Sequence, residues 1–294
     1  MKKVSIIIVT YKSEKDIFDC IRSIYKTLDI NPQDLEIIIV DNHSPGQTEM
    51  FRGIRERFGN DILLIANKKN GGYGQGNNVG IRAATAPVIL IMNPDVRLFQ
   101  PIFKKALSTF EKEPDLVMLG MKQMYSLSKP TTKSFTVSKN LSFFQTVRCL
   151  ICKRFDIYLP KFMYIDGACF FIKKESFEKI GLFDENIFMY GEENDIHYRI
   201  IEEFGAKIIY DKSLKYIHLT EARSLTIDYM KKTLSSNIYV MGKMNIPKEE
   251  VIKYYYKNTD QLIYKQKLLS LIGKQDKQLL CLMMDFRSYL KGQL

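Results

Sequence analysis

The sequence lacks several features that mark membrane-spanning, disulfide-stabilised or zinc-binding proteins. It contains no run of 18 apolar residues, so no transmembrane helix is expected. Its five cysteines include one C-x-x-C pair, Cys149 and Cys152, and no second pair, which favours a reducing compartment over a disulfide framework. With only three histidines, a zinc site is not expected either. The first residues, MKKVSIIIVTYKSEK, have too short an apolar run for a secretion signal and lack a small-residue cleavage site, so we expect a cytoplasmic protein.

Acidic residues are scarce in two parts of the chain, which carries a formal net charge of +11. Residues 122–161 contain eight Lys or Arg and one acidic residue, Asp156, and residues 225–294 contain twelve basic residues against six acidic ones. Basic segments of this kind attract polyanions such as nucleic acid, anionic lipid or phosphorylated substrates. A solvated basic face without a partner is the alternative.

Apolar patterning predicts the fold class. With 294 residues, of which 46% are hydrophobic, the chain can bury a large core. In the first 120 residues, apolar runs typical of buried strands alternate with helical stretches, which predicts βαβ units and a parallel sheet covered on both faces. The strands are expected at residues 4–9, 35–40, 62–66 and 86–92, and the helices between them at 15–28, 48–58 and 76–84.

The later part of the chain is less regular. Residues 122–163 lose the periodicity and contain the polar, basic stretch SLSKPTTKSFTVSKN, so a mobile loop or a partly ordered insertion is expected there. A strand and a short helix should follow, then a helix that begins near Gly191 and is closed by Gly205. Two more strands are expected in AKIIYD and LKYIHL, and amphipathic helices from residue 225 onward.

Polar residues follow the second predicted strand, in IIIVDNHS. An aspartate directly after a buried parallel strand, here Asp41, can accept a hydrogen bond from the N–H of a nucleotide base. The alternative is purely structural, with Asp41 and Asn42 as turn residues and Ser44 capping the next helix.

Glycine is missing after the first strand, where a dinucleotide-binding protein would have G-x-G-x-x-G, and this argues against NAD binding. Glycines gather instead in NGGYGQGNNVGI, residues 70–81. They would let backbone N–H groups and the start of the following helix approach phosphates. A plain glycine-rich turn is the alternative.

The fourth strand is interrupted by Asn93, Pro94 and Asp95. Pro94 removes a backbone N–H and stops the strand from continuing in the ladder. Asp95 then lies at the carboxyl edge of the sheet, and its carboxylate, with the amide oxygen of Asn93, suits Mg²⁺ or Mn²⁺. An Asn-Pro-Asp turn without chemical meaning is the alternative.

The segment GEENDIHYR is the richest acidic cluster. Glu192 and Glu193 fall in the first turn of the predicted helix, where one of them could act as a general base or both could simply complement the helix dipole. Asp195 and Arg199 are one turn apart and can pair. His218, at the end of a predicted strand, is either a structural histidine or a ligand of metal or phosphate.

Taken in order, SIIIVTY, VDNHS, NGGYGQGNNVGI, NPDV, DGACFFIKKESFEKIGLFDE and YGEENDIHYR resemble the family-two inverting glycosyltransferases of the GT-A fold, in particular rhamnosyltransferase-like members. The resemblance covers residues 3–224. It implies an α/β catalytic domain over residues 1–224 with a mostly parallel central sheet flanked by helices. Residues 1–120 would form the nucleotide-binding half, residues 121–224 the acceptor side with the basic insertion, and residues 225–294 a helical extension.

The resemblance also assigns roles to individual residues. Asp166 and Gly167 would contact the donor sugar, and Glu193 would be the base, with Glu192 as the second candidate. Asp195 and Arg199 would position the base. Asn93 stands where the family's D-x-D motif has its first aspartate. The nucleotide would be bound by Thr10, Tyr11, Asp41, Asn42, Gly76 and Asn77, and the metal by Asp95, Asn93 and His218.

The function implied is inverting, metal-dependent transfer of a sugar from a UDP- or dTDP-linked donor, dTDP-rhamnose among them. The acceptor would be a hydroxyl of a glycan or lipid-linked molecule in surface polysaccharide synthesis, with Mg²⁺ or Mn²⁺ as cofactor. The basic segments would suit peripheral contact with an anionic membrane, the C-terminal helices a homodimer, and no nucleic-acid partner is expected. Rival interpretations are a nucleotidyltransferase, a catalytically inactive sugar-nucleotide-binding relative and, from the pI of 9.2 and the KYYYK segment, a nucleic-acid-binding protein.

Overall fold

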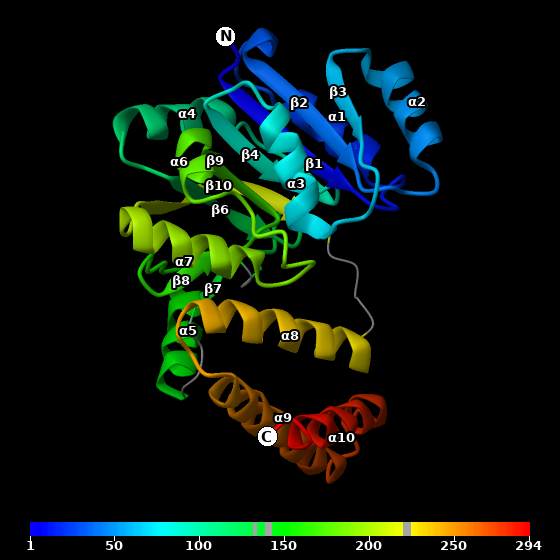
Figure 1. Cartoon of the computed structure of the whole chain (residues 1–294), viewed down its shortest axis with the longest axis vertical. Coiled ribbons are helices and arrows are strands. Elements are labelled where there is room, and N and C mark those ends of the chain that lie inside the picture. The colour runs from blue at the N-terminus through cyan, green and yellow to red at the C-terminus, as the bar shows by residue number, and fades with distance from the viewer. Residues whose placement is uncertain (132–133, 139–142, 220–224) are drawn as a thin grey trace. The chain divides into compact units, whose positions relative to one another are not determined.

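A computed structural model describes residues 1–131, 134–138, 143–219 and 225–294 (Figure 1). The chain forms two compact units. The first comprises Met1–Ser138 and Cys149–Glu221, and the second comprises Lys139–Arg148 and Ala222–Leu294. The first unit holds every residue to which the sequence assigned a chemical role.

An eight-stranded sheet forms the centre of the first unit, in the order β3-β2-β1-β4-β9-β6-β10-β5. Strands β1 to β4 are parallel to one another, as are β6 and β10, whereas β9 is antiparallel to β4 and β6, and β5 is antiparallel to β10. The expected mostly parallel sheet is therefore present in a mixed form. The strands are β1 (Val4–Thr10), β2 (Leu35–Asp41), β3 (Ile62–Ala66), β4 (Val88–Met92), β5 (Val96–Leu98), β6 (Met118–Met124), β9 (Cys169–Lys173) and β10 (Ile208–His218).

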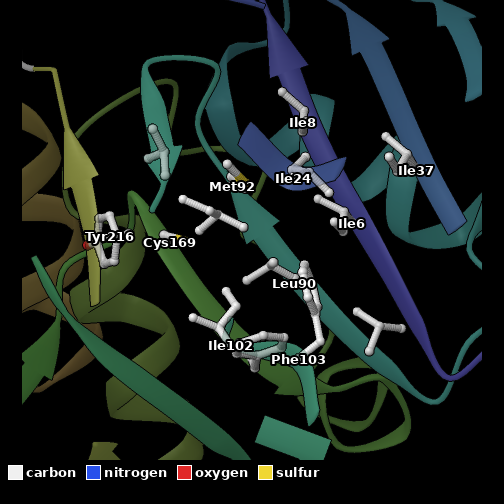
Figure 2. Close-up of a cluster of buried hydrophobic side chains, with 14 of the residues drawn as sticks. Ile6, Ile8, Ile24, Ile37, Leu90, Met92, Ile102, Phe103, Cys169 and Tyr216 are labelled. Carbon is white, nitrogen blue, oxygen red and sulfur yellow. The ribbon is translucent and has the colours of Figure 1, made fainter. Parts of the chain in front are cut away.

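Helices cover both faces of this sheet, which explains why its strands β1, β2 and β4 are almost entirely apolar. Along β1, Ile6 and Ile8 join one buried cluster and Ile7 joins another. The first cluster, part of which Figure 2 shows, includes side chains of α1 (Ile17–Thr27), α2 (Gln47–Phe58) and α4 (Phe103–Lys112). The second includes side chains of α3 (Gly72–Ala83), α5 (Phe143–Phe155), α6 (Lys174–Lys179) and α7 (Glu192–Phe204).

The region expected to be a loop or a partly ordered insertion contains regular structure. Strands β7 (Phe135–Val137) and β8 (Met163–Ile165) form a two-stranded antiparallel sheet, with α5 between them in the chain. The apolar periodicity did not predict helix α5, because apolar residues lie on both its buried and its exposed sides and form no single apolar stripe. Residues 132–133 and 139–142 of the expected insertion lie outside the described residues.

Two strands expected near the end of this unit are one continuous strand. Strand β10 runs through both predicted segments, and its pairing with β6 shifts register between Asp211 and Lys215. The polar residues of this shift resemble a turn in the sequence, whereas the structure accommodates them as a bulge.

The second unit is helical, as the amphipathic pattern predicted. It contains α8 (Ile227–Lys243), α9 (Lys248–Ser270) and α10 (Lys277–Lys291). Their buried side chains include Val251 and Ile252 of α9 and Phe286 and Leu290 of α10. Within the described part of the chain, no helix combines the length and the apolar character that crossing a bilayer requires.

Candidate active site

The ends of β1 and β2 hold two of the predicted nucleotide-binding residues together. Thr10 and Asp41 are paired in register, and Thr10 Oγ1 donates a hydrogen bond of 2.9 Å to Asp41 Oδ1. Ser44 adds two more bonds to this carboxylate, from its N–H to Oδ2 and from its hydroxyl to Oδ1, both 2.7 Å long. Thr10 and Asp41 have no exposed surface, whereas Tyr11 beside them is 45% exposed. Asp41 thus organises this edge of the sheet, and Tyr11 presents its ring to solvent.

The glycine-rich segment forms the first turns of α3 and packs closely on the sheet. Asn42 Nδ2 donates to the carbonyl of Gly72 at 2.8 Å, and this contact fixes the start of the helix. A Cβ on Gly76 would lie 2.7 Å from Val9 Cγ1 and 2.8 Å from Asn42 Nδ2, which is too close for any side chain. Gly76 therefore serves the approach of α3 to β1 and β2. In the next residue, Asn77, the buried Oδ1 has no hydrogen-bond partner among the described residues.

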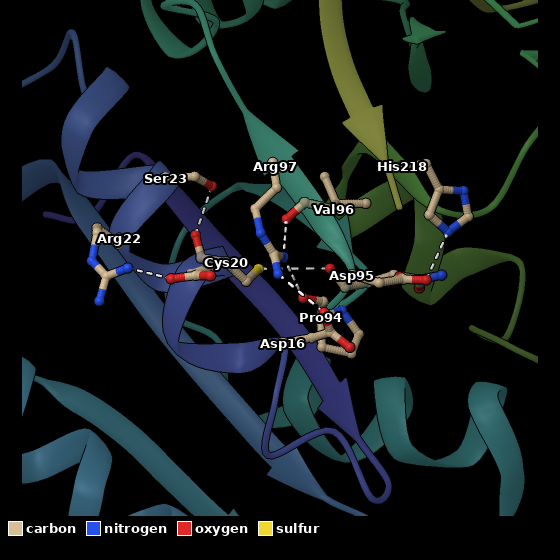
Figure 3. A network of polar contacts seen from close by, with 11 residues as sticks. Asp16, Cys20, Arg22, Ser23, Pro94, Asp95, Val96, Arg97 and His218 are labelled. Atoms are coloured by element: carbon tan, nitrogen blue, oxygen red, sulfur yellow. Dashed lines mark hydrogen bonds and ion pairs between the residues drawn. The ribbon is translucent and has the colours of Figure 1, made fainter. Parts of the chain in front are cut away.

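Asp95 and His218 face each other, although they lie far apart in the sequence. After Asp95 the chain enters β5, which pairs with β10 and places Val96 opposite His218. Asp95 Oδ2 lies 3.2 Å from His218 Nε2, as Figure 3 shows. Asp95 Oδ1 is buried and has no hydrogen-bond partner among the described residues.

This pair fits a divalent cation. Two neighbouring ligands of an octahedral Mg²⁺ or Mn²⁺ lie about 3 Å apart, close to the separation of the two side chains here. No group of three or more Asp, Glu, His or Cys side chains suited to a metal occurs in the described part of the chain, so phosphate or water oxygens would complete the coordination. Asn93 makes backbone contacts here, since its N–H donates to Ala168 O and its carbonyl accepts from Val96 N.

Arg97 and Cys20 support this turn, and neither of them was identified as a site residue from the sequence. Arg97 Nη1 donates to the carbonyls of Pro94 at 2.8 Å and Val96 at 2.9 Å, and its Nη2 contacts Asp16 at 3.1 Å (Figure 3). The Cys20 thiol lies 3.6 Å from the carbonyl of Asn93. The sequence feature that could have indicated this role is the position of Arg97, two residues beyond Asp95 and within a short apolar strand.

The start of α7 brings Glu193 to the turn that contains Asp166 and Gly167. Gly191 caps the helix with φ of 108°, and Tyr190 before it also has a positive φ, of 72°. This bend lets the Glu193 carboxylate accept hydrogen bonds from the backbone N–H groups of Gly167 and Gly191. A Cβ on Gly167 would collide with the Glu193 side chain, so a larger residue there would displace this carboxylate.

The two adjacent glutamates differ in their surroundings. Burial, followed by the negative charge of Asp166, raises the pKa of Glu193 above that of an ordinary glutamate. Burial, followed by the charge of Glu193, also raises the pKa of Glu192. Glu192 is almost completely buried, and its Oε1 has no hydrogen-bond partner among the described residues. Glu193 is the more exposed of the two and is the one that contacts the 166–167 turn.

Asp195 and Arg199 form the expected ion pair within α7. Arg199 Nε and Nη2 reach Asp195 Oδ2 at 2.9 and 2.6 Å, and Arg199 Nη1 donates to the carbonyl of Ile180. The pair thus ties the first turn of α7 to the end of α6. Its contribution to the site is the orientation of the helix that carries Glu193.

Tyr73 links the glycine-rich segment to the same turn and was not identified from the sequence. Its hydroxyl donates to the carbonyl of Gly167 at 2.7 Å, and its N–H donates to Phe188 O at 3.1 Å. Its ring packs edge-on against Phe183. A single aromatic residue among glycines was the only signal for this role.

Comparison with known proteins identifies the family. The model of Glycosyl transferase family 2 matches residues 5–181, more than half of the chain. The chain belongs to this family. The prediction of a family-two glycosyltransferase is confirmed, whereas its assignment to a rhamnosyltransferase-like subtype stays a prediction.

Several known proteins are similar to this family-two glycosyltransferase. The low-salt glycan biosynthesis hexosyltransferase Agl10 of Haloferax volcanii is 26% identical over 245 residues, covering 79% of this chain and 75% of Agl10. The poly(ribitol-phosphate) beta-N-acetylglucosaminyltransferase TarS of Staphylococcus aureus is 28% identical over 176 residues, covering 55% of this chain and 30% of TarS. The matched segment, about half of this chain, therefore spans less than a third of TarS.

Solved structures share the fold. The mannosyltransferase PcManGT of Pyrobaculum calidifontis, solved with GDP-Man and Mn²⁺, superposes with a TM-score of 0.63 at 14% identity, covering 98% of this chain and 85% of that one. Residues 1–349 of TarS with UDP-GlcNAc give a TM-score of 0.56 at 15% identity, covering 86% and 70%. The α/β GT-A fold with C-terminal helices is thereby confirmed.

Proposed function

We propose that this glycosyltransferase is an inverting, metal-dependent enzyme that transfers a sugar from a nucleotide-diphosphate donor to a hydroxyl of a glycan or lipid-linked acceptor. The observation that carries the proposal is the facing pair of Asp95 and His218 at the carboxyl edge of the sheet, where Asp95 Oδ1 has no hydrogen-bond partner among the described residues. Relatives support it, since Agl10 is named for glycan biosynthesis and TarS for modification of poly(ribitol-phosphate). We accordingly place the reaction in surface polysaccharide synthesis, with a UDP- or dTDP-sugar, dTDP-rhamnose among them, as donor.

Asp95 and His218 would hold the cation. A divalent ion there would supply positive charge beside the donor diphosphate, where negative charge grows as the bond to the sugar breaks. Mn²⁺ in the PcManGT complex supports this use of a metal by a protein of the same fold. Arg97 keeps the 93–95 turn in place by binding two of its carbonyl groups.

Glu193 would act as the general base. It accepts the proton of the acceptor hydroxyl as that oxygen bonds to the anomeric carbon, and the bond from this carbon to the diphosphate oxygen breaks on the opposite face. Configuration at the carbon is thereby inverted. The N–H groups of Gly167 and Gly191 orient the carboxylate, and the neighbouring Asp166 and Gly167 would meet the donor sugar.

The nucleotide would lie against Tyr11 and the start of α3. Asp41 has no exposed surface, and its carboxylate is bound by Thr10 and Ser44, so direct contact with a base requires these groups to move. We therefore assign base stacking to the exposed Tyr11 and hydrogen bonding to Asn77, whose Oδ1 has no partner within the described part of the chain. Asp41, Asn42 and Gly76 would hold the surrounding backbone in place.

Turnover at saturating substrate is expected to rise with pH, with a midpoint above the usual glutamate pKa of about 4.3. The base must lose its proton before it can act. Burial together with Asp166 raises the pKa of Glu193, so the acidic limb of the pH profile, where kcat rises with pH, lies at higher pH than for an ordinary glutamate. Replacing Asp166 with asparagine removes a negative charge, lowers this pKa and should move the limb to lower pH. A pH profile of kcat measures both effects, and a limb that Asp166→Asn leaves in place would contradict the role of Glu193.

Titration with nucleotides tests the proposed function as a whole. UDP, dTDP, GDP and CDP are added with and without Mn²⁺ while binding is followed by calorimetry, and UMP serves as the control without a second phosphate. We expect Mn²⁺ to strengthen binding of UDP or dTDP and to have little effect on UMP, because Asp95 and His218 would hold the cation, whose charge favours a diphosphate. If none of the diphosphates binds in either condition, the proposal is wrong, and preference for GDP would replace the donor assignment.

A further inference from the structure

Helix α5 and the turn after it expose an unusual number of large apolar side chains. Within the first unit, Leu150 is 62% exposed, Ile151 52% and Phe155 67%, and Ile157 follows at 47%. The opposite side of the helix is buried, with Cys149 and Cys152 in the second core cluster. The exposed side therefore contributes nothing to the core. Contiguous apolar surface of this kind usually marks an interaction site.

The same surface is basic. Arg154 lies between the exposed apolar residues and Lys161 follows them, and both are exposed. Asp156 is the sole acidic residue of the sequence between positions 143 and 161. Its carboxylate contacts Lys122 and accepts a hydrogen bond of 2.9 Å from Tyr210, so its charge is compensated within the protein. The exposed charge at this surface is consequently positive.

This surface is connected to the candidate active site through short contacts. The carbonyl of Pro160 lies 2.6 Å from His197 Nε2 on α7, the helix that begins with Glu192 and Glu193. Strand β8 then leads directly to Asp166 and Gly167. A partner held at α5 would thus be attached to the elements that carry the proposed base and donor-sugar residues.

Apolar side chains flanked by Arg and Lys suit the interface of an anionic bilayer, where the apolar groups enter the acyl boundary and the cations meet phosphate headgroups. A second copy of this chain fits less well, because pairing two such surfaces would bring like charges together. We propose that Leu150, Ile151, Phe155 and Ile157, with Arg154, dock the enzyme on an anionic membrane surface. This deepens the proposed function, on which it rests, by assigning the acceptor to a lipid carrier.

Co-sedimentation of the full chain with vesicles tests the proposal. The vesicles contain phosphatidylcholine with or without phosphatidylglycerol, and the variant carries Ile151→Ser and Phe155→Ser. The matched control carries Leu271→Ser and Ile272→Ser, which change residues that are 80% and 63% exposed in the second unit. We expect the parent and the control to bind vesicles that contain phosphatidylglycerol. The affinity of the α5 variant for these vesicles should be lower by a factor on the order of ten or more. Arg154→Glu should weaken binding to the same vesicles without removing apolar surface.

Four outcomes would overturn the proposal. Two concern the parent, which would either fail to bind vesicles or bind them without dependence on phosphatidylglycerol. In the third, the control variant loses binding and the α5 variant keeps it. In the fourth, light scattering without vesicles shows a dimer that the α5 variant converts to a monomer, which would make this face an interface between copies. Mn²⁺-dependent nucleotide binding, measured on the same variants, reports on the proposed function separately. Its retention in an α5 variant that no longer binds vesicles shows that docking and donor binding are independent.

Discussion

Replacing Glu193 with glutamine is expected to lower turnover by a factor on the order of 10² to 10⁴ and to leave donor affinity unchanged. Glutamine has nearly the same shape and keeps one oxygen to accept the N–H groups of Gly167 and Gly191. It cannot accept a proton from the acceptor hydroxyl. The loss should therefore appear in kcat, because proton transfer contributes only in the transition state.

Glu192→Gln is the matched control for this experiment. Glu192 has less solvent-accessible surface than Glu193, and it is Glu193 that contacts Gly167, so the change at Glu192 should have a much smaller effect on kcat. Transfer to an acceptor and hydrolysis of the donor are measured for both variants, with nucleotide titration as the check on donor binding. Near-normal turnover in Glu193→Gln, together with a large loss in Glu192→Gln, would assign the base to Glu192.

Replacing Asp95 with asparagine is expected to remove the strengthening of UDP or dTDP binding by Mn²⁺ and to lower turnover by a factor on the order of 10² or more. The amide keeps the size of the side chain and removes the negative charge that a divalent cation needs. His218 alone offers a single ring nitrogen to the cation. Binding should persist in part, because base and ribose contacts do not involve the cation.

Asp19→Asn provides the control, since Asp19 is an exposed carboxylate on α1 that contacts Arg22. Calorimetry with and without Mn²⁺ should give the parental difference for this variant and none for Asp95→Asn. An Asp95→Asn protein whose nucleotide affinity still rises with Mn²⁺ would show that the cation binds elsewhere. Calorimetry measures nucleotide binding and requires no transfer reaction, so the result is informative without knowledge of the acceptor.

Local patterns were sufficient for much of the fold. The apolar runs predicted β1 to β4 to within about two residues, because a strand covered on both faces must be apolar throughout. Gly191 and Gly205 bound α7 as expected, since both adopt a positive φ that other residues avoid. The pair of Asp195 and Arg199 followed from helical spacing alone.

The same local patterns failed in two segments, α5 and β10. Helix α5 has a buried side and an exposed apolar side, so its sequence shows no stripe and suggested an irregular insertion. In β10, the polar stretch within the strand resembled a turn, and pairing with β6 decided otherwise. In both segments the deciding interactions come from residues distant in the sequence, which propensity and periodicity do not contain.

The sequence by itself determined the family, the α/β class and the residue types available for chemistry, because these depend on short ordered motifs and on local periodicity. The tertiary structure alone decided which residues meet. Asp95 faces His218 because β5 pairs with β10, and Glu193 meets Gly167 because a left-handed bend at Tyr190 and Gly191 directs α7 toward that turn. Tyr73 and Arg97 entered the site for the same reason, since each holds backbone groups that only folding brings within hydrogen-bonding distance.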